Sequence, residues 1–357
     1  MHYKILISFT MKFPKIFEIK TSKRYFFVAS LSSILSDGAL YKFYGTSGRF
    51  DGYCFYLKRR KLNIVKQSNY LTFMRKMIAL NPIPDDENKF SGMYDIIQYL
   101  FQNNKPLEVH LFKGQFLYGF ILSYDTEQIK MKALYFNGSV YKDNVNISVS
   151  NIKELFFGSP GLEKYEFLLQ EDVIDDLKET PVIYSKQPLI KLHTLCSIFF
   201  KSRYCFEVGY INGIDDGKVI MDLFDEEGFY DGVLIRDLAE VSKISYRGKY
   251  LKMMDKLINI HHSKAKMLNK NDFNGIMKYC LENQITVNIS TKNRKQFDYA
   301  IIKEINSSDL LCAHYDGFAH YIGERKYPLK DINYLCFGDE LTKNFNQIIN
   351  TKDVLTK

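Results

Sequence analysis

The chain has 357 residues, which is too long for one small core and predicts two or more domains. Its 26 Tyr and 28 Phe favour half-buried strands, although an A+T-rich coding sequence would enrich the same residues. The net charge of +8 permits an acidic partner without requiring one. The six cysteines show no clustered spacing, and no apolar run approaches the ~18 residues of a membrane span. We therefore exclude a zinc-stabilised or disulfide-stapled protein and expect a cytoplasmic protein that makes no membrane contact.

The first predicted unit spans residues 12–78 and is mainly β. One of its strands bends at the small residue Ala29 and ends in a turn near Leu35. A short helix closes the unit, because four apolar residues recur with helical spacing: Tyr70, Phe73, Met74 and Met77. The polar stretch 81–90 then predicts a linker.

The second predicted unit spans residues 91–170 and begins with a helix over 91–103. Ser91 is its expected N-cap, and its apolar stripe consists of Met93, Ile96, Ile97, Leu100 and Phe101. In the following stretch, 106–136, apolar and polar residues broadly alternate, which predicts three strands. A further helix is expected after Pro160, in the segment that joins the two halves of the chain.

The stretch from Gly48 to Ile78 recurs 180 residues later, from Gly228 to Ile258, without a gap. Nine positions are identical: Gly48/Gly228, Asp51/Asp231, Gly52/Gly232, Ile64/Ile244, Tyr70/Tyr250, Leu71/Leu251, Met74/Met254, Lys76/Lys256 and Ile78/Ile258. Six of the other 22 pairs exchange one apolar residue for another, among them Cys54/Leu234 and Phe55/Ile235. The chain is therefore predicted to be a tandem duplication of a block of about 180 residues.

The duplication predicts a third unit at 190–258 and a fourth at 271–350. The fourth unit begins with a second amphipathic helix, N-capped by Asn271 or Asp272, with its stripe at Phe273, Ile276, Met277, Cys280 and Leu281. The expected fold class is mainly β with short flanking helices.

Unit two carries a spaced pattern of Val109, Gly114, Gly119 and Asp125. Together with a short helix before the strands, this pattern resembles the first motif of the Sm-like fold, as found in Hfq-type proteins. The stretch 145–157 resembles the last two short strands of that family. In unit three, the Ile235-Arg236 pair resembles the second Sm motif.

The resemblance is incomplete. Unit three has Asp237 where the family has glycine, and units one and four lack the glycines of the first motif. Other SH3-like small barrels are compatible with the same pattern. If the units are Sm-like, the resemblance implies four tandem small barrels that pair edge to edge in an arc or pseudo-ring, or that self-associate through their edges.

The resemblance also implies RNA contacts from the turns between strands two and three and between strands four and five. At the second of these turns, unit one has a run of cations beside aromatic residues. The candidate nucleic-acid-binding residues are Tyr56, Lys58, Arg59, Arg60, Lys61, Lys66 and Arg236. The competing interpretations are a solvated basic turn and, for Arg236, an ion pair with Asp237 or Glu240.

The expected function is non-catalytic binding of single-stranded RNA. The alternative is a protein-interaction scaffold that uses barrel edges or aromatic grooves. A third hypothesis, an enzyme or small-ligand sensor, has no catalytic motif behind it. No cofactor is expected, because the adjacent His261 and His262 lack a third metal ligand and the acidic clusters lie in predicted turns.

Overall fold

The computed structural model describes residues 15–20, 26–58, 62–81, 90–112, 114–135, 140–170, 190–201, 206–263, 272–292 and 297–355. Strands predominate over helices in this part of the chain, and the strands form two large sheets. The prediction of a mainly β fold with short flanking helices is confirmed. Within the described residues, we find no helix with the length and apolar character needed to cross a membrane.

Sheet A contains ten antiparallel strands in the order β5-β1-β2-β3-β4-β10-β6-β7-β8-β9. The strands of unit one are β1 (Ile16–Lys20), β2 (Phe26–Ile34), β3 (Gly38–Tyr44), β4 (Phe50–Leu57) and β5 (Asn63–Val65). The strands of unit two are β6 (Leu107–Leu111), β7 (Phe116–Tyr124), β8 (Gln128–Leu134), β9 (Val140–Ser148) and β10 (Ile152–Phe157). The two units therefore share one continuous sheet.

Sheet B repeats this arrangement in the order β15-β11-β12-β13-β14-β20-β16-β17-β18-β19. Unit three supplies β11 (Leu195–Phe200), β12 (Phe206–Asp215), β13 (Lys218–Phe224), β14 (Tyr230–Asp237) and β15 (Val241–Ser245). Unit four supplies β16 (Thr286–Thr291), β17 (Asp298–Ile305), β18 (Asp309–Tyr315), β19 (Tyr321–Pro328) and β20 (Ile332–Phe337). The identical strand order in the two sheets is compatible with duplication of a block.

The helices flank the strands. They are α1 (Asn69–Ala79), α2 (Met93–Gln102), α3 (Pro160–Gln170), α4 (Lys249–Ile260), α5 (Phe273–Glu282) and α6 (Glu340–Leu355). Three 3₁₀ helices, η1 (Val149–Asn151), η2 (Leu238–Glu240) and η3 (Leu329–Asp331), precede the last strands of units two, three and four. The N-cap of α5 is Asp272, as predicted, but the N-cap of α2 is Gly92 rather than Ser91, whose hydroxyl contacts Asp95 instead.

The strands at the junction of two units each serve two hydrophobic cores. Phe55 of β4 and Leu155 of β10 are buried in the core of unit two, whereas their neighbours Cys54 and Phe156 pack in the core of unit one. Strands β14 and β20 do the same for units three and four. Because side chains alternate across a strand, one pair of strands joins both cores in each block.

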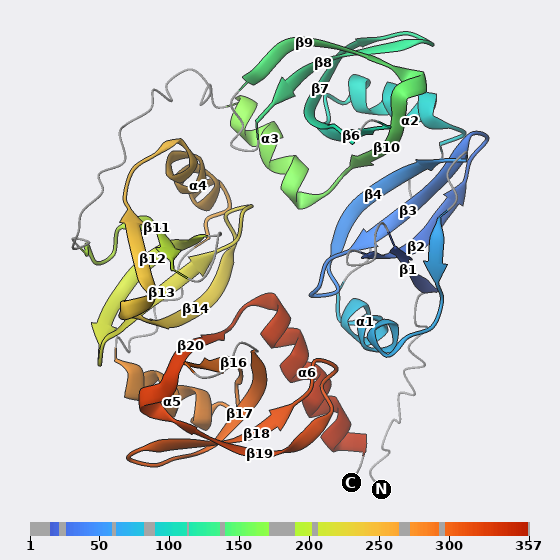
Figure 1. Cartoon of the computed structure of the whole chain (residues 1–357). Coiled ribbons are helices and arrows are strands. Elements are labelled where there is room, and N and C mark those ends of the chain that lie inside the picture. Colours follow the sequence, from blue (N-terminus) through green and yellow to red (C-terminus); the bar gives the residue numbers. More distant parts are fainter. Residues whose placement is uncertain are drawn as a thin grey trace, which may run out of the picture.

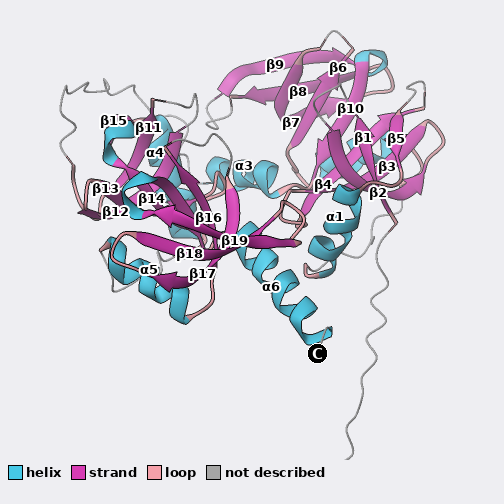
Figure 2. Ribbon diagram, turned by 60° about the horizontal axis from the view of Figure 1, so that its bottom comes forward, coloured by secondary structure: helices cyan, strands magenta, loops and turns pink. Residues whose placement is uncertain are grey.

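Figure 1 shows the four units arranged around a common centre, and the view in Figure 2 shows helices between the two sheets. Within each block the joint is a pair of strands. Between blocks the joints are helical, since α1 packs against α6 and α3 packs against α4. The chain thus closes into a four-unit ring through two kinds of contact.

Two glycines that are identical in the repeat lie at these joints. A Cβ added to Gly52 would lie 2.8 Å from the carbonyl oxygen of Phe157, and one added to Gly232 would lie 2.4 Å from that of Phe337. Both glycines also have positive φ, at 94° and 92°. The repeat therefore retains glycine where a strand of one unit meets the end of the last strand of the next unit.

Candidate functional site

The basic turn predicted in unit one begins at the end of β4. Lys58 is exposed, and its backbone N–H donates to the carbonyl oxygen of Asp37 at 2.8 Å. Lys66 is also exposed, just after β5. The other three cations of the turn, Arg59, Arg60 and Lys61, lie outside the described residues. Lys58 is thus the described start of the basic turn.

Lys58 borders a pocket of about 410 Å³ where units one and two meet, which we call the junction pocket. Its lining residues are Asp37, Leu57, Lys58, Met93, Phe112, Val149 and Ser150. Four of these side chains are apolar, and Phe112 is 55% exposed. A large exposed ring beside a cation offers a surface on which a planar ligand could stack.

Hydrogen bonds between and within the two units hold the segments that line this pocket. The Asp37 carboxylate accepts the N–H of Met93, the first residue of α2, at 3.1 Å, and the Ser36 N–H donates to the carbonyl of Ser91. In unit two, the Phe112 N–H donates to the carbonyl of Asn151, which holds the β6–β7 turn against η1. The turn after β2, the start of α2 and the β6–β7 turn are far apart in the sequence, and they meet around the junction pocket.

Sequence reasoning missed Phe112. The residue was part of an alternating apolar stretch, where an aromatic residue is normally assigned to the core. The available signal was its place in the turn Leu111-Phe112-Lys113-Gly114, since Gly114 has a φ of 78° and ends the strand pattern.

Tyr56 is not positioned for base stacking. It is 2% exposed, and its ring packs edge-on against Tyr41 with centroids 5.6 Å apart. Because successive residues of β4 face opposite sides, Tyr56 points into the core of unit one while Leu57 borders the junction pocket. Lys58 follows the end of β4 and borders the pocket from the turn.

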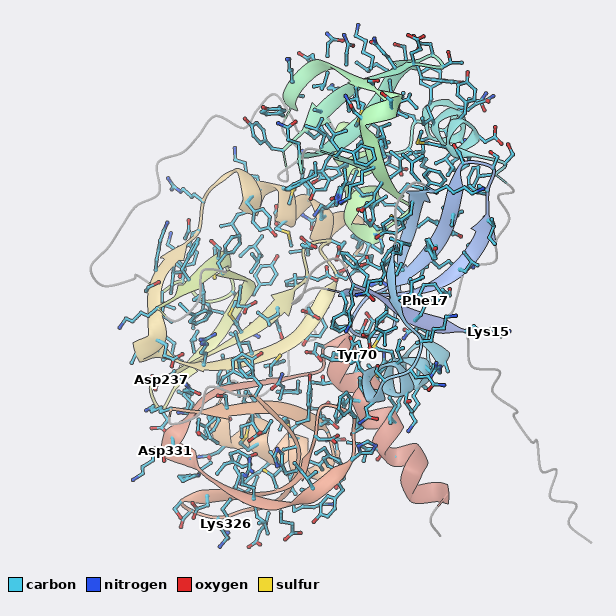
Figure 3. The ribbon with its side chains drawn as sticks, turned by 45° about the vertical axis from the view of Figure 1, so that its right-hand side comes forward. Lys15, Phe17, Tyr70, Asp237, Lys326 and Asp331 are labelled. Carbon is cyan, nitrogen blue, oxygen red and sulfur yellow. The ribbon has the colours of Figure 1, made fainter. Side chains whose placement is uncertain are left out.

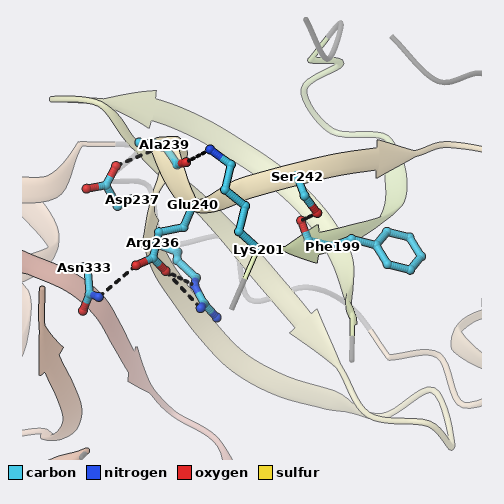
Figure 4. Close-up of polar contacts among 8 residues, drawn as sticks. All are labelled: Phe199, Lys201, Arg236, Asp237, Ala239, Glu240, Ser242 and Asn333. Atoms are coloured by element: carbon cyan, nitrogen blue, oxygen red, sulfur yellow. Dashed lines mark hydrogen bonds and ion pairs between the residues drawn. The ribbon is translucent and has the colours of Figure 1, made fainter. Parts of the chain in front are cut away.

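Arg236 is also buried, with 4% of its surface exposed, and Figure 4 shows its polar contacts. Its Nε and Nη2 atoms donate to Glu240 Oε2 at 3.1 and 3.0 Å, and its guanidinium lies 3.8 Å from the ring centre of Phe200. The second carboxylate oxygen of Glu240 accepts from Asn333 Nδ2 on β20. Arg236 thus forms the ion pair with Glu240 that was the competing interpretation, and the cluster ties unit three to unit four.

Asp237 pairs elsewhere. Its carboxylate lies 3.0 Å from Lys292 Nζ, and this hydrogen bond raises the pKa of Lys292. The backbone N–H of Lys292 donates to the carbonyl of Asp331, and Figure 3 shows Asp237 and Asp331 near each other at the junction of units three and four.

The second block differs from the first at the positions that form the junction pocket. At an offset of 180 residues, Lys292 corresponds to Phe112 and Leu238 corresponds to Lys58. At these two equivalent positions, the second block has neither the exposed ring nor the first cation of the basic turn.

The centre of the ring has the opposite charge. A cavity of about 440 Å³ there is bordered by acidic residues: Asp51, Asp225, Glu226, Glu227, Asp231, Asp339 and Glu340, with Arg49 as the cation of the lining. Burial, followed by the negative charges of Asp339 and Asp225, raises the pKa of Asp231 to about 8. Such a surface repels phosphates, so it does not suit nucleic acid.

The described residues contain no group of three His, Cys, Asp or Glu side chains placed to hold a metal ion. The junction pocket offers the exposed ring of Phe112, the cation of Lys58, the hydroxyl of Ser150 and the Asp37 carboxylate, which already accepts the Met93 N–H. No protein-family model matches the chain, and no curated protein matches it either. The geometry and charge of this site are accordingly the basis on which a function is proposed.

Proposed function

We propose that the protein binds single-stranded RNA, without catalysis, at the junction pocket and the adjoining basic turn of unit one. The observation that carries this proposal is the position of exposed Lys58 beside the exposed ring of Phe112. A base would stack on Phe112, and the phosphates on either side would meet Lys58, Arg59, Arg60 and Lys61. Lys66 would extend the cationic surface.

We further propose that each unit is an Sm-like small barrel. Five strands per unit, a short helix before the strands of units two and four, and pairing of strand edges between neighbouring units all support this reading. Cys54, Cys196, Cys280, Cys312 and Cys336 lie buried as thiols, which fits the proposed cytoplasmic location.

The test is fluorescence anisotropy with short labelled A-rich and U-rich RNAs, titrated at several salt concentrations. We expect the wild type to bind with an affinity that falls steeply as salt rises. Reversing the charge of Lys58, Arg59, Arg60 and Lys61 together should abolish most of that salt dependence.

The matched control reverses four exposed lysines elsewhere, Lys130, Lys142, Lys252 and Lys278, so that the net charge changes equally. Phe112→Ala should weaken binding about tenfold at constant charge, because it removes the stacking surface. If the control weakens binding as much as the reversal in the turn, binding is non-specific and the proposed site is wrong.

The second candidate function is a protein-interaction scaffold, and the ends of the sheets favour it. Strands β9 and β19 end the two sheets among the described residues, and both are largely exposed. Tyr141 on β9 and Ile322 on β19 are large exposed apolar residues on these edges. An edge of this kind can pair with a strand of another chain.

Self-association is the form of this function that can be measured directly. Size-exclusion chromatography with light scattering should give a mass above one chain, and a proline in β9, such as Asn144→Pro, should restore the mass of one chain. A single-chain mass at all concentrations would remove self-association through this edge.

A further inference from the structure

A second pocket, of about 500 Å³, lies on unit four beside α6, and we call it the unit-four pocket. Figure 1 shows α6 running alongside the strands of this unit. The buried residues Ala313 and Ala319 form its floor, and the rings of Tyr315 and Tyr321 border it, 5.9 Å apart. Tyr321 is 59% exposed, so one large aromatic face is accessible beside a floor of two methyl groups.

Unit four differs from unit two at two equivalent positions that border this pocket. Ala313 pairs with Ile301 one step before the bulge in β17, and in unit two Lys132 pairs with Phe120 at the same step before the bulge in β7. By the same register, Tyr321 of β19 corresponds to Val140 of β9, since each opposes the last residue of the preceding strand. In unit four, Ala313 thus stands where unit two has Lys132, and Tyr321 stands where unit two has Val140.

Hydrogen-bonding groups of both kinds surround this hollow. Lys303 supplies a donor and Glu324 an acceptor. His320 is held in place by Asp316, whose carboxylate lies 3.0 Å from the ring Nδ1 and also accepts the His320 backbone N–H at 2.9 Å. Because Nδ1 is engaged by Asp316, the Nε2 edge of the ring is the one that can serve a ligand.

We propose that the unit-four pocket binds a heteroaromatic base of the kind found in nucleosides. The base stacks on Tyr321 over Ala313 and Ala319, and its polar edge meets Lys303, His320 and Glu324. A mixed set of donor and acceptor matches the edge of a nucleobase better than it matches an anion or a hydrocarbon. The base comes either from a free nucleoside or nucleotide or from a single strand. This inference stands on unit four alone and does not depend on RNA binding at the junction pocket.

The experiment is saturation-transfer NMR on the full chain with adenosine, guanosine, cytidine and uridine in turn, and with a short mixed-sequence oligonucleotide. Two variants install the residues that unit two carries, Tyr321→Val and Ala313→Lys. The matched control is Tyr94→Val, an exposed tyrosine of α2 in unit two. Circular dichroism confirms that each variant is folded.

We expect at least one base to bind, Tyr321→Val to weaken it about tenfold, Ala313→Lys to abolish it, and the control to bind as the wild type does. Binding of a nucleoside identifies a free ligand, and binding of the oligonucleotide alone identifies a strand. If no base binds, or if folded Tyr321→Val binds as tightly as the wild type, the proposal is overturned.

Discussion

Asp37 and Met93 join two units through one contact: the Asp37 carboxylate of unit one caps the N-terminus of α2 in unit two by accepting the Met93 N–H. We predict that Asp37→Ala lowers the free energy of unfolding by about 1 kcal/mol, the usual cost of a lost N-cap. Urea unfolding followed by circular dichroism measures the change.

The second block offers a matched pair for this experiment. Asp215 caps α5 in the same way, accepting the Phe273 N–H at 2.8 Å, so Asp215→Ala should cost a similar amount. Asp255→Ala, on the exposed face of α4, should change stability by less than about 0.5 kcal/mol. Equal effects in all three variants would show that capping is not the cause.

The joint between units three and four tolerates no side chain at Gly232. A Cβ there would lie 2.4 Å from the Phe337 carbonyl oxygen and 2.6 Å from the Asp339 nitrogen, at a φ of 92°. Gly232→Ala should therefore destabilise the protein by more than about 2 kcal/mol. Gly317→Ala, where no atom lies within 4 Å of the added Cβ, is the control and should be nearly neutral in thermal unfolding.

The acidic centre makes stability depend on pH. The pKa of Asp231 is raised to about 8, so between about pH 4 and pH 8 the folded state holds a proton that the unfolded state has released. Stability should therefore fall as pH rises through this window. The melting temperature, measured from pH 5 to pH 9, should drop, and Asp231→Asn should flatten the slope. An unchanged slope in this variant would assign the pH dependence to other groups.

Arg236 should matter for stability and not for RNA binding. Removing Glu240 leaves the buried guanidinium without its ion-pair partner, so Glu240→Ala should cost about 3 kcal/mol. Arg236→Met removes the charge while filling the same space and should cost less. RNA affinity of folded Arg236→Met should stay within about twofold of wild type in the anisotropy assay, whereas a large loss would return Arg236 to the binding site.

Local patterns in the sequence predicted the elements well. The stripe of α2 predicted from helical spacing is buried at Met93, Ile96, Ile97 and Leu100, and only Phe101 is substantially exposed. Spacing succeeds here because the period of a helix is set within a few residues. The resemblance implied that units pair edge to edge, but it did not identify β4 and β10 as the paired strands, because they lie about a hundred residues apart and neither strand encodes its partner.

Some features of the candidate site could likewise be predicted from local sequence, and others depend on the tertiary structure. Charge and exposure of Lys58 and Lys66 follow from their polar turns, and the structure describes both as exposed. The burial of Tyr56 and Arg236 depends on which face of β4 and β14 turns inward, which the position of the strand in the sheet decides. Phe112 lies at the site because of contacts between segments that are far apart in the sequence, and these contacts cannot be inferred from local sequence patterns.

The sharing of junction strands has a consequence for synthesis of the chain on the ribosome. Strand β4 ends at Leu57, but β10, which completes the core around Cys54 and Tyr56, starts at Ile152, about 95 residues later. At the usual rate of translation, roughly 5–20 residues per second, the first unit waits about 5–20 seconds for that strand. A nascent chain halted before Ile152 would leave β4 and β6 without the strand that joins them, so the sheet of the first block becomes continuous only once β10 has been synthesised.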